Sequence, residues 1–335
     1  MSDSAGGSLR WGVLGPGNIA HSVARDFPLV DGGVLAAVGS RSLDRAQAYA
    51  DEFSVPKAYG SYREVIEDPE VDALYIATPH PQHLELGLAG AAAGKHLLVE
   101  KAFTATVPGA EELIRAVRSA GVFCMEAMWT RFQPIWVETR QLLADGVIGE
   151  LRQVRAELGV AVDFDPQHRL FDPAQGGGAI LDVGIYPISL AHWLLGTPDE
   201  VRVTGAQTST GVDGEAAVLF GYDDGRAALL QASVNFPLPG GALLVGTEGS
   251  IEVLPRFHHG STLLLRNRDG DVTERHLPSP GVGYVHEFDE VHRCVAAGLT
   301  ESPVMPLDDS LSVQRLLNQA CEALGVRHQE DRSVL

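Results

Sequence analysis

The pattern of hydrophobic positions divides the chain into two parts of different character. Between residues 9 and 126, short apolar runs rich in Val, Leu and Ile alternate with segments of helical periodicity. We expect buried strands at 11–14, 34–40, 58–59, 73–77, 96–100 and 122–126. Strands that alternate with helices are typical of a parallel, doubly wound sheet. The first part therefore predicts an α/β domain over residues 9–126.

Local signals place several helix ends in this first part. Ser61 is positioned to cap a helix over 62–67, and Pro108 is suited to the start of a helix that continues to Arg118. Gly94 and Gly121 stand where helices are expected to end, because glycine tolerates the left-handed backbone of a helix terminus.

The second part alternates apolar and polar residues with a period of two. Such runs cover 151–162, 200–210, 214–222 and 226–236, with turn signals at 223–225, 248–250 and 269–270. They predict an α+β domain with a mainly antiparallel, open sheet over 151–306, interrupted by a helix near 179–195. We also expect a disordered lead over 1–8, a connecting helix over 127–150, and a helix near 284–297. A C-terminal segment, 307–335, is expected to pack back on the first domain through a helix near 308–324.

Charge and cysteine content exclude several classes of function. The formal charge of the 335 residues is −19, so the chain has no basic face for nucleic acid or for an anionic membrane. No uncharged stretch approaches the span of a bilayer, and we expect a cytoplasmic protein. Cys124, Cys294 and Cys321 are widely spaced, which indicates neither a disulfide framework nor a thiolate metal site.

A glycine-rich loop follows the first predicted strand. Gly15-Pro-Gly17-Asn18-Ile19-Ala20 fits the G-x-G-x-x-A pattern: Gly15 suits the tight turn, Gly17 lets a diphosphate approach the backbone, and Ala20 allows close helix packing. A loop that merely joins a strand to a helix could look the same. At the first strand of a doubly wound sheet, however, it predicts a Rossmann dinucleotide-binding domain.

The end of the second strand bears on the choice of cofactor. NAD enzymes usually place Asp or Glu there, whereas this chain has Ser40 followed by Arg41. A hydroxyl next to a guanidinium suits a 2′-phosphate, so NADP is favoured, with NAD as second choice. In the alternative interpretation, Arg41 is a solvated loop residue and Asp44 binds the ribose.

Two further strand ends carry candidate residues. Thr78 and Pro79 could line the nicotinamide side of a cofactor, and His80 and His83 follow in a loop where we expect polar contacts and no metal. Lys101 is one of only three lysines, against 22 arginines, and it follows the apolar run 96–100. Lysine can exchange a proton near neutral pH when desolvated, although a lysine at a strand end can also be only an ion-pair partner.

The glycines at 176–178 open the helix of the second part. Asp182 and Tyr186 are four residues apart and would share one face of an α-helix. Asp182 could equally be a first-turn charge favoured by the helix dipole, and Tyr186 a core residue.

Taken together, these motifs resemble the glucose–fructose oxidoreductase/inositol dehydrogenase (Gfo/Idh/MocA) family over nearly the whole chain. The segments 126–132 and 176–187 are most similar to its branch of dimeric trans-1,2-dihydrobenzene-1,2-diol dehydrogenases and NADP-dependent xylose dehydrogenases. The resemblance implies that Lys101 is the active-site lysine, Tyr186 the proton donor and acceptor, and Asp182 a carboxylate that orients the substrate or tunes the pair.

The resemblance also implies a wider set of contacts and one departure. Glu100, Trp129 and Arg131 match positions near the cofactor, together with His83, and Phe164 and Arg169 are weaker substrate candidates. The family usually has proline after the lysine, where this chain has Ala102. A non-proline cis bond costs about 2.5–4 kcal/mol, so we expect a trans bond or a differently shaped loop.

The expected function is hydride transfer between NADP and a carbinol or carbonyl carbon of a sugar, polyol or cyclic trans-diol. A homodimer through the second-domain sheet is expected from the resemblance. Two alternatives stay open: a catalytically silent NADP-binding sensor or scaffold, and a cofactor-retaining isomerase or glycoside-cleaving relative.

Overall fold

The computed structural model describes residues 8–335, which divide into two compact units. Unit 1 contains residues up to Met128 together with Pro280–Leu311 and Glu330–Leu335, and unit 2 contains Trp129–Ser279 and Ser312–Gln329. The lead expected over 1–8 falls outside the described residues, apart from the exposed Ser8. The predicted domain boundary between residues 306 and 307 does not coincide with this division. The division falls inside α9 (Leu307–Ala323), which begins in unit 1 and continues into unit 2.

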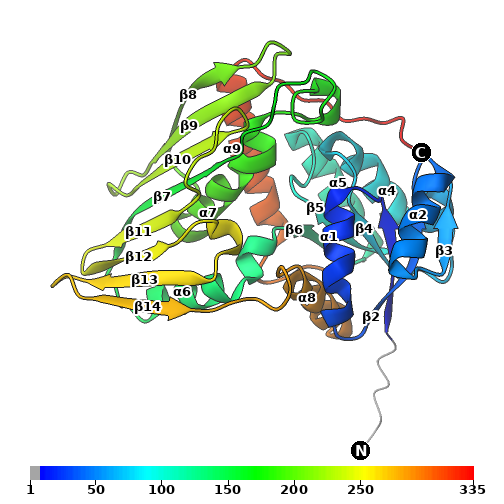
Figure 1. The fold of residues 1–335 in the computed structure, drawn as a ribbon, viewed down its shortest axis with the longest axis horizontal. Helices are drawn as coiled ribbons and strands as arrows, with labels where there is room; N and C mark the ends of the chain where they lie inside the picture. The colour runs from blue at the N-terminus through cyan, green and yellow to red at the C-terminus, as the bar shows by residue number, and fades with distance from the viewer. Residues whose placement is uncertain (1–7) are drawn as a thin grey trace, which may run out of the picture. The chain divides into compact units, whose positions relative to one another are not determined.

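Unit 1 is built on a six-stranded sheet with the order β3-β2-β1-β4-β5-β6, in which every pairing is parallel (Figure 1). Its strands are β1 (Leu9–Leu14), β2 (Gly33–Gly39), β3 (Lys57–Tyr59), β4 (Ala73–Ile76), β5 (His96–Glu100) and β6 (Cys124–Ala127). The predicted strands and the doubly wound arrangement are confirmed. The strand order reverses between β1 and β4, and ligands of such sheets bind beyond the carboxyl ends of the strands near this reversal.

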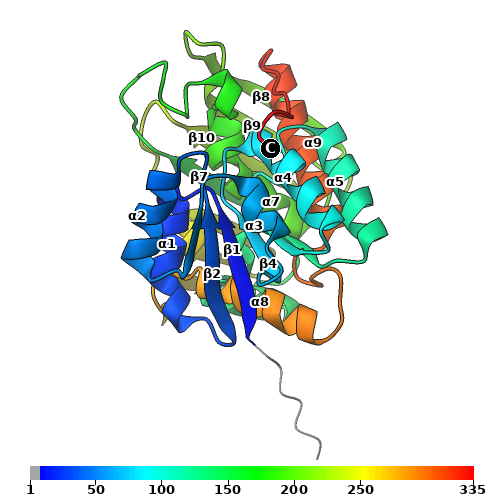
Figure 2. The ribbon, with the colours of Figure 1, turned by 90° about the vertical axis from the view of Figure 1, so that its right-hand side faces the viewer.

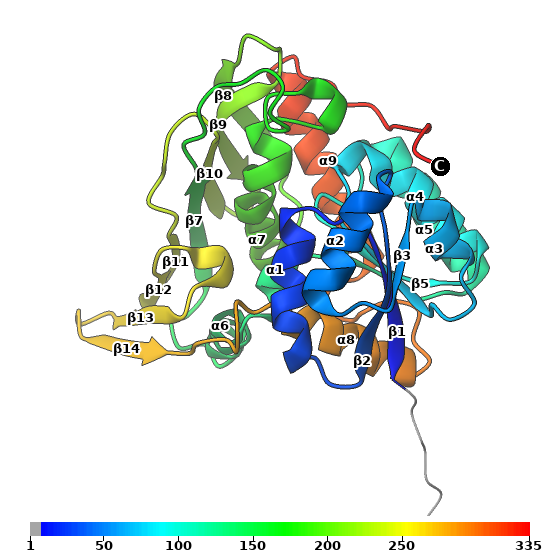
Figure 3. The same ribbon diagram turned by 45° about the vertical axis from the view of Figure 1, so that its right-hand side comes forward.

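Helices cover both faces of this sheet. Figures 2 and 3 show α1 (Asn18–Asp26) beside α2 (Leu43–Phe53). The core of the other face is formed by apolar residues of α3 (Tyr62–Glu67), α4 (His83–Ala92) and α5 (Val107–Ala120) against the strands. Ser61 caps α3 through the N–H of Glu64, and Gly94 and Gly121 have positive φ, as predicted. The cap of Ser61 thus fixes the start of α3.

The helix α8 (Val285–Ala296) returns to unit 1 late in the chain. Phe288 makes edge contacts with Trp11, Phe27 and Tyr75. The carboxylate of Asp26 accepts hydrogen bonds from three consecutive backbone N–H groups, 282–284, just before α8 begins. A single buried carboxylate thus satisfies donors that the start of a helix leaves free.

Unit 2 contains an eight-stranded sheet with the order β14-β13-β12-β11-β7-β10-β9-β8 (Figure 1). Its strands are β7 (Leu151–Gly159), β8 (Glu200–Gln207), β9 (Asp213–Gly221), β10 (Ala227–Ser233), β11 (Ala242–Gly246), β12 (Gly249–Val253), β13 (Thr262–Asn267) and β14 (Val272–His276). Only the β7–β10 pair is parallel, so the predicted, mainly antiparallel sheet is confirmed.

One face of this sheet is covered by helices of the same unit. The segment η5 (Ile180–Gly184) and α7 (Ile185–Leu195) pack on β7 and β10, and α6 (Pro134–Ala144) supplies the connecting helix. The predicted helix near 179–195 is confirmed, and its first turn, η5, is a π-helix. Pro187 has no backbone N–H and its ring would clash with the carbonyl of Val183 in a regular α-helix, which explains the irregular turn.

The helical run Pro173–Leu195 is long and apolar enough to cross a membrane, by length and composition only. However, 89% of its apolar window is buried within the protein. Burial of this kind is what a core helix requires, and α7 fills that role in unit 2.

Candidate active site

The glycine-rich loop of unit 1 has the geometry of a diphosphate cradle. Gly15 has φ +91°, a conformation that favours glycine, and a side chain there would press on Thr78. Nothing lies within 4 Å of the position that a side chain of Gly17 would occupy. No side chain caps the N-terminus of α1 and no acidic residue lies in its first turn. These open backbone donors fit a dinucleotide's diphosphate.

The end of β2 is positively charged. Ser40 is buried, while Arg41 is exposed on the loop that leads into α2. The guanidinium groups of Arg41 and Arg45 lie close to the hydroxyl of Tyr62. Burial raises the pKa of the Tyr62 phenol, and the two guanidinium charges oppose this rise. Two cations therefore flank the place where the ribose of a dinucleotide is expected.

Lys101 follows β5 in a loop held by buried carboxylates. The backbone N–H of Lys101 donates to Glu100, and the N–H of Phe103 donates to Oε1 of Glu126 at 2.9 Å. The expectation of a trans bond after Lys101 was wrong, because the Lys101–Ala102 peptide bond is cis. Ala102 and Phe103 are fully buried, so tertiary contacts that the sequence does not reveal decide the path of this loop.

His83 joins the Lys101 loop to the Thr78 loop. Its Nδ1 lies 2.9 Å from the carbonyl oxygen of Ala102, and its Nε2 lies 2.8 Å from that of Thr78. Complete burial lowers the pKa of His83 to about 4, although both carbonyls favour the protonated ring. At neutral pH the ring therefore donates to one carbonyl only. Both ring nitrogens contact backbone carbonyls, so His83 positions the two loops; its contact with a cofactor stays a prediction.

The other two lysines of the chain have structural roles. Lys57 forms ion pairs with Asp68 and Glu70, and Lys95 donates to the carbonyl oxygens of Asp68 and Val71 at 2.8 and 2.6 Å. Both lysines hold the turn before β4. Lys101 is thus the lysine that the fold places at a loop beyond a central strand.

In unit 2, Tyr186 lies in a cluster of aromatic rings. The indole nitrogen of Trp129 donates to the Tyr186 hydroxyl at 3.1 Å. The ring of His258 lies 4.8 Å from that of Tyr186, and His259 stacks on Trp129 at 5.1 Å. Thr130 fixes this arrangement by donating to the carbonyl oxygen of His258. The Tyr186 ring, carried by α7, is therefore held by neighbours from η3 (Trp129–Phe132) and η6 (Phe257–His259).

Asp182 forms an ion pair with Arg169. The two guanidinium contacts are 2.9 and 3.4 Å long, and the Asp182 side chain is only 10% exposed while that of Arg169 is half-exposed. Arg169, which the sequence suggested as a weaker candidate for contact with the substrate, therefore binds the carboxylate of Asp182. Phe164, half-exposed, packs on Phe171 in the same loop region.

Arg131 is buried, with its guanidinium over the ring of Trp193 at 5.3 Å. The histidines His258 and His259 were missed in the sequence, where their only signal is a His-His pair in a loop between two strands. Their proximity to Tyr186 depends on the contact of η3 with η6, which the pattern of hydrophobic residues does not reveal.

Comparison with known families matches both units. Residues 9–128 match the model described as "Oxidoreductase family, NAD-binding Rossmann fold", and residues 136–252 match the GFO/IDH/MocA C-terminal domain. The chain belongs to the Gfo/Idh/MocA oxidoreductase family. The resemblance inferred from the motifs is therefore confirmed, and so are the Rossmann fold class and the oxidoreductase activity.

Curated members of the family are similar over nearly their whole length. The trans-1,2-dihydrobenzene-1,2-diol dehydrogenase of Danio rerio is 37% identical, and that of Homo sapiens 34%, each over 97% of this chain and 99% of the relative.

Solved structures of family members share the fold. An aldose-aldose oxidoreductase from Caulobacter crescentus is 24% identical with a TM-score of 0.86, covering 95% of this chain and 98% of that one. A 3-ketoreductase from Actinomadura kijaniata, solved with NADP and TDP-benzene, is 25% identical with a TM-score of 0.83, covering 96% and 99%.

Proposed function

We propose that this Gfo/Idh/MocA member is an NADP-dependent dehydrogenase that acts on a CH–OH carbon of a sugar, polyol or cyclic trans-diol. Tyr186 is the proton donor and acceptor, Lys101 its cationic partner and Asp182 the orienting carboxylate. The observation that carries the proposal is the hydrogen bond from the Trp129 indole to the Tyr186 hydroxyl. The relatives named diol dehydrogenases, the aldose-aldose oxidoreductase and the 3-ketoreductase support the substrate class.

Tyr186 is suited to moving a proton because its oxygen already accepts one hydrogen bond. During oxidation it would take the proton of the substrate hydroxyl, and a donor to its oxygen stabilises the deprotonated form. The ion pair with Arg169 holds Asp182 in one orientation. The family resemblance implies that the Lys101 ammonium favours tyrosinate and holds the substrate oxygen. Bound NADP would supply the redox chemistry by accepting or delivering a hydride at its nicotinamide ring.

NADP is the proposed cofactor because of the charge at the end of β2. The glycine loop and the open N-terminus of α1 would hold the diphosphate, and Arg41 and Arg45 would bind a 2′-phosphate. No carboxylate takes the place of Ser40, where NAD enzymes bind the ribose hydroxyls. The A. kijaniata ketoreductase was solved with NADP, which supports this choice.

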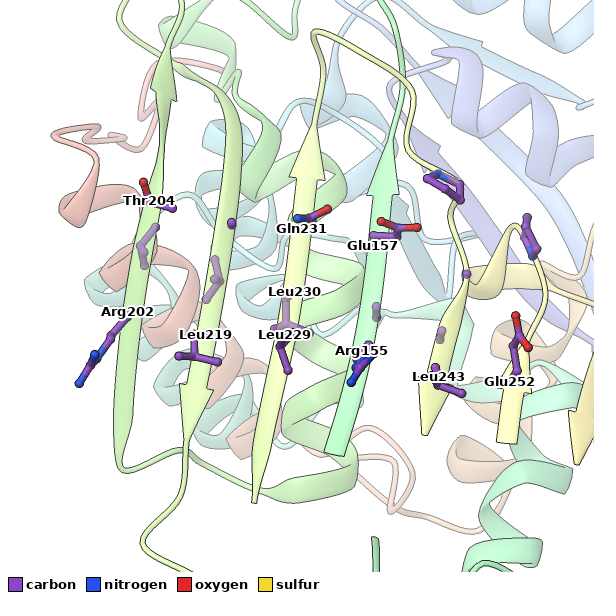
Figure 4. A pocket seen from close by; sticks show the side chains of 18 residues that line it. Arg155, Glu157, Arg202, Thr204, Leu219, Leu229, Leu230, Gln231, Leu243 and Glu252 are labelled. Carbon is purple, nitrogen blue, oxygen red and sulfur yellow. The ribbon is translucent and has the colours of Figure 1, made fainter. Parts of the chain in front are cut away.

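We propose a homodimer formed through the face of the unit 2 sheet that η5 and α7 do not cover, which we call the outer face. An open groove of about 730 Å³ crosses β8, β9, β10, β7, β11 and β12, and none of the proposed catalytic residues lines it (Figure 4). Leu219 and Leu229 are directly paired across β9 and β10 and both are exposed. Arg155, Arg202, Glu157 and Glu252 carry both signs of charge on this face, which suits a two-fold interface with a second copy.

The cytoplasm is the proposed location. The three cysteines are buried free thiols, which suits a reducing compartment. Fractionation of cells that express a tagged chain would test this, and recovery in the membrane or secreted fraction would contradict it.

The activity is tested by following NADPH formation over a panel of aldoses, inositols and trans-diols. We expect turnover by the wild type and a loss of at least about 100-fold in kcat for Lys101→Met and Tyr186→Phe, with NADP binding retained by Tyr186→Phe. Near wild-type turnover by both variants would contradict the assigned roles. NADP binding without turnover would favour a sensor, and cofactor that stays bound through desalting and is re-reduced would favour an isomerase.

A further inference from the structure

A buried cluster in unit 2 brings together three side chains that can ligate metals. Asp213 begins β9, Cys321 lies near the end of α9, and His328 follows that helix. All three are buried, and their ligand atoms lie within 4.8 Å of one another. The cluster is separate from the groups of the proposed dehydrogenase reaction.

Several polar atoms of the cluster have no hydrogen-bond partner among residues 8–335. They are Oδ1 of Asp213 and both ring nitrogens of His328. Asp213 is fully buried, and its other oxygen accepts a hydrogen bond of 2.6 Å from the backbone N–H of Ile180. Buried polar atoms without partners are costly and rare in native proteins. One carboxylate oxygen of Asp213 and one ring nitrogen of His328 lie close to each other and to the Cys321 sulfur, which indicates a missing ligand that accepts an electron pair from each of the three side chains.

We propose that Asp213, Cys321 and His328 form a binding site for one divalent transition-metal ion, with Zn²⁺ as the preferred occupant. Carboxylate, thiolate and imidazole are the ligand types that Zn²⁺ takes in proteins. A tetrahedral zinc ion with bonds of about 2.0–2.3 Å separates its ligand atoms by roughly 3.3–3.8 Å. The limit of 4.8 Å between the present atoms therefore requires only small side-chain movements, and a water molecule would complete the tetrahedron.

The charges of the cluster agree with this assignment. Burial raises the pKa of Asp213 to about 7 and that of the Cys321 thiol well above its usual range, and burial lowers the pKa of His328 to about 4. Burial thus disfavours charge on all three groups as long as no metal is bound. Binding of Zn²⁺ would displace the thiol proton and any proton on the carboxyl group. The product, a dication with a carboxylate, a thiolate and a neutral imidazole, has no net charge and tolerates burial.

The metal would act on the structure of unit 2. Asp213 holds the N–H of Ile180, the first residue of η5, and this segment contains Asp182 and leads directly into Tyr186. Gly178 has φ +125°, and a side chain there would collide with Oδ1 of Asp213. A metal ion on Asp213 would therefore fix the start of the helix that carries the proposed proton-transfer residue, as a positioning and not a catalytic group.

Metal content and spectroscopy of the tag-free, full-length protein test the proposal. After chelation, loading with Zn²⁺ and gel filtration, we expect about one zinc per chain by elemental analysis. Loading with Co²⁺ in place of zinc should give a thiolate-to-cobalt charge-transfer band and the visible bands of a tetrahedral site. Affinity should fall as the pH is lowered, because protons compete with the metal for the thiolate and the carboxylate.

Matched variants show which residues bind. Cys321→Ala and His328→Ala should each lower the zinc affinity at least about tenfold and remove or shift the cobalt bands, whereas Cys124→Ala, which removes another buried thiol, should leave both unchanged. The cobalt spectrum of the wild type tests the site even if a variant fails to fold. Failure of the wild type to take up either metal, or cobalt bands without a thiolate contribution, would overturn the proposal. So would unchanged zinc content in both site variants.

Discussion

The indole nitrogen of Trp129 donates a hydrogen bond of 3.1 Å to the hydroxyl oxygen of Tyr186. Both rings are buried, and each also contacts one of the neighbouring histidines, His258 or His259. A donor in this place stabilises negative charge on the tyrosine oxygen more than it stabilises the neutral hydroxyl. Trp129 is thus a positioning residue for the group that we propose moves the proton.

Replacing Trp129 by Phe keeps an aromatic ring against His259 and removes the donor. Because a hydrogen bond to a charged group contributes about 1.5–3 kcal/mol, we expect kcat to fall roughly 10- to 100-fold. The rising limb of the pH–rate profile should move to higher pH, since the basic form of Tyr186 loses its stabilising donor. Steady-state kinetics across pH would measure both effects.

Trp136→Phe is the matched control for this variant. The Trp136 indole donates to the backbone carbonyl of Phe257, so its loss should lower stability without moving the pH–rate profile. An equal displacement of the profile in both variants would show that general loosening of unit 2, and not the donor to Tyr186, is responsible.

Arg41→Ser should change cofactor preference. Loss of a charge-assisted hydrogen bond to a 2′-phosphate should weaken NADP binding roughly 10- to 100-fold and leave NAD binding almost unchanged. Isothermal titration with each cofactor measures the ratio. Arg63→Ser, which removes an exposed arginine paired with Glu67 on α3, is the control and should affect neither. Tighter binding of NAD than NADP by the wild type would contradict the Arg41 assignment.

Glu287 on α8 makes stability depend on pH. It is fully buried, neither carboxylate oxygen has a hydrogen-bond partner among the described residues, and burial and the charge of Glu100 raise its pKa well above the usual range. Glu100 accepts from Tyr75 and from the Lys101 N–H, so the charge lies on Glu100 and the proton on Glu287.

A raised carboxyl pKa in the folded state stabilises the protein below the unfolded value of about 4.3, and this stabilisation is lost as pH rises. Glu287→Gln should therefore reduce the fall in unfolding free energy as the pH rises above about 4.3, as measured by urea denaturation.

Glu290→Gln, on the same helix, is expected to behave in the opposite way. Hydrogen bonds from Arg293 and Ser302 outweigh burial and lower the pKa of Glu290, so its stabilisation is present above the unfolded pKa and is lost as pH falls. The glutamine variant should thus be less stable than the wild type at neutral pH. An unchanged pH slope in Glu287→Gln would show that this carboxyl group ionises freely in the folded protein.

Leu229→Asp should disrupt the proposed dimer. The charge would lie in the middle of the outer sheet face, opposite Leu219 and Arg155, where an interface would have to bury it. We expect a dimer for the wild type and a monomer for the variant by light scattering after gel filtration. Leu299→Asp changes a leucine of equal exposure, 42%, in unit 1 and should remain dimeric. A monomeric wild type, or a dimeric Leu229→Asp, would contradict the interface.

The local sequence was sufficient to predict the helices and strands and the glycine-rich loop proposed to bind the cofactor. Apolar runs located the strands of unit 1 because a parallel sheet is buried on both faces. Ser61 marked a helix start through its side-chain cap, and Gly94 and Gly121 marked helix ends because their backbone adopts a positive φ. The glycine loop was recognisable for the same reason: the tight turn at Gly15 requires a positive φ there.

Contacts between distant residues were decided only by the tertiary structure. The sequence by itself determined the family, the two kinds of sheet and the identity of Lys101, Asp182 and Tyr186 as candidates. It did not reveal that Trp129 and His258 surround Tyr186. It also gave no indication of a metal site, because the three cysteines are widely spaced in the sequence. Packing brings distant groups together, and burial then changes their protonation, neither of which is encoded in local spacing.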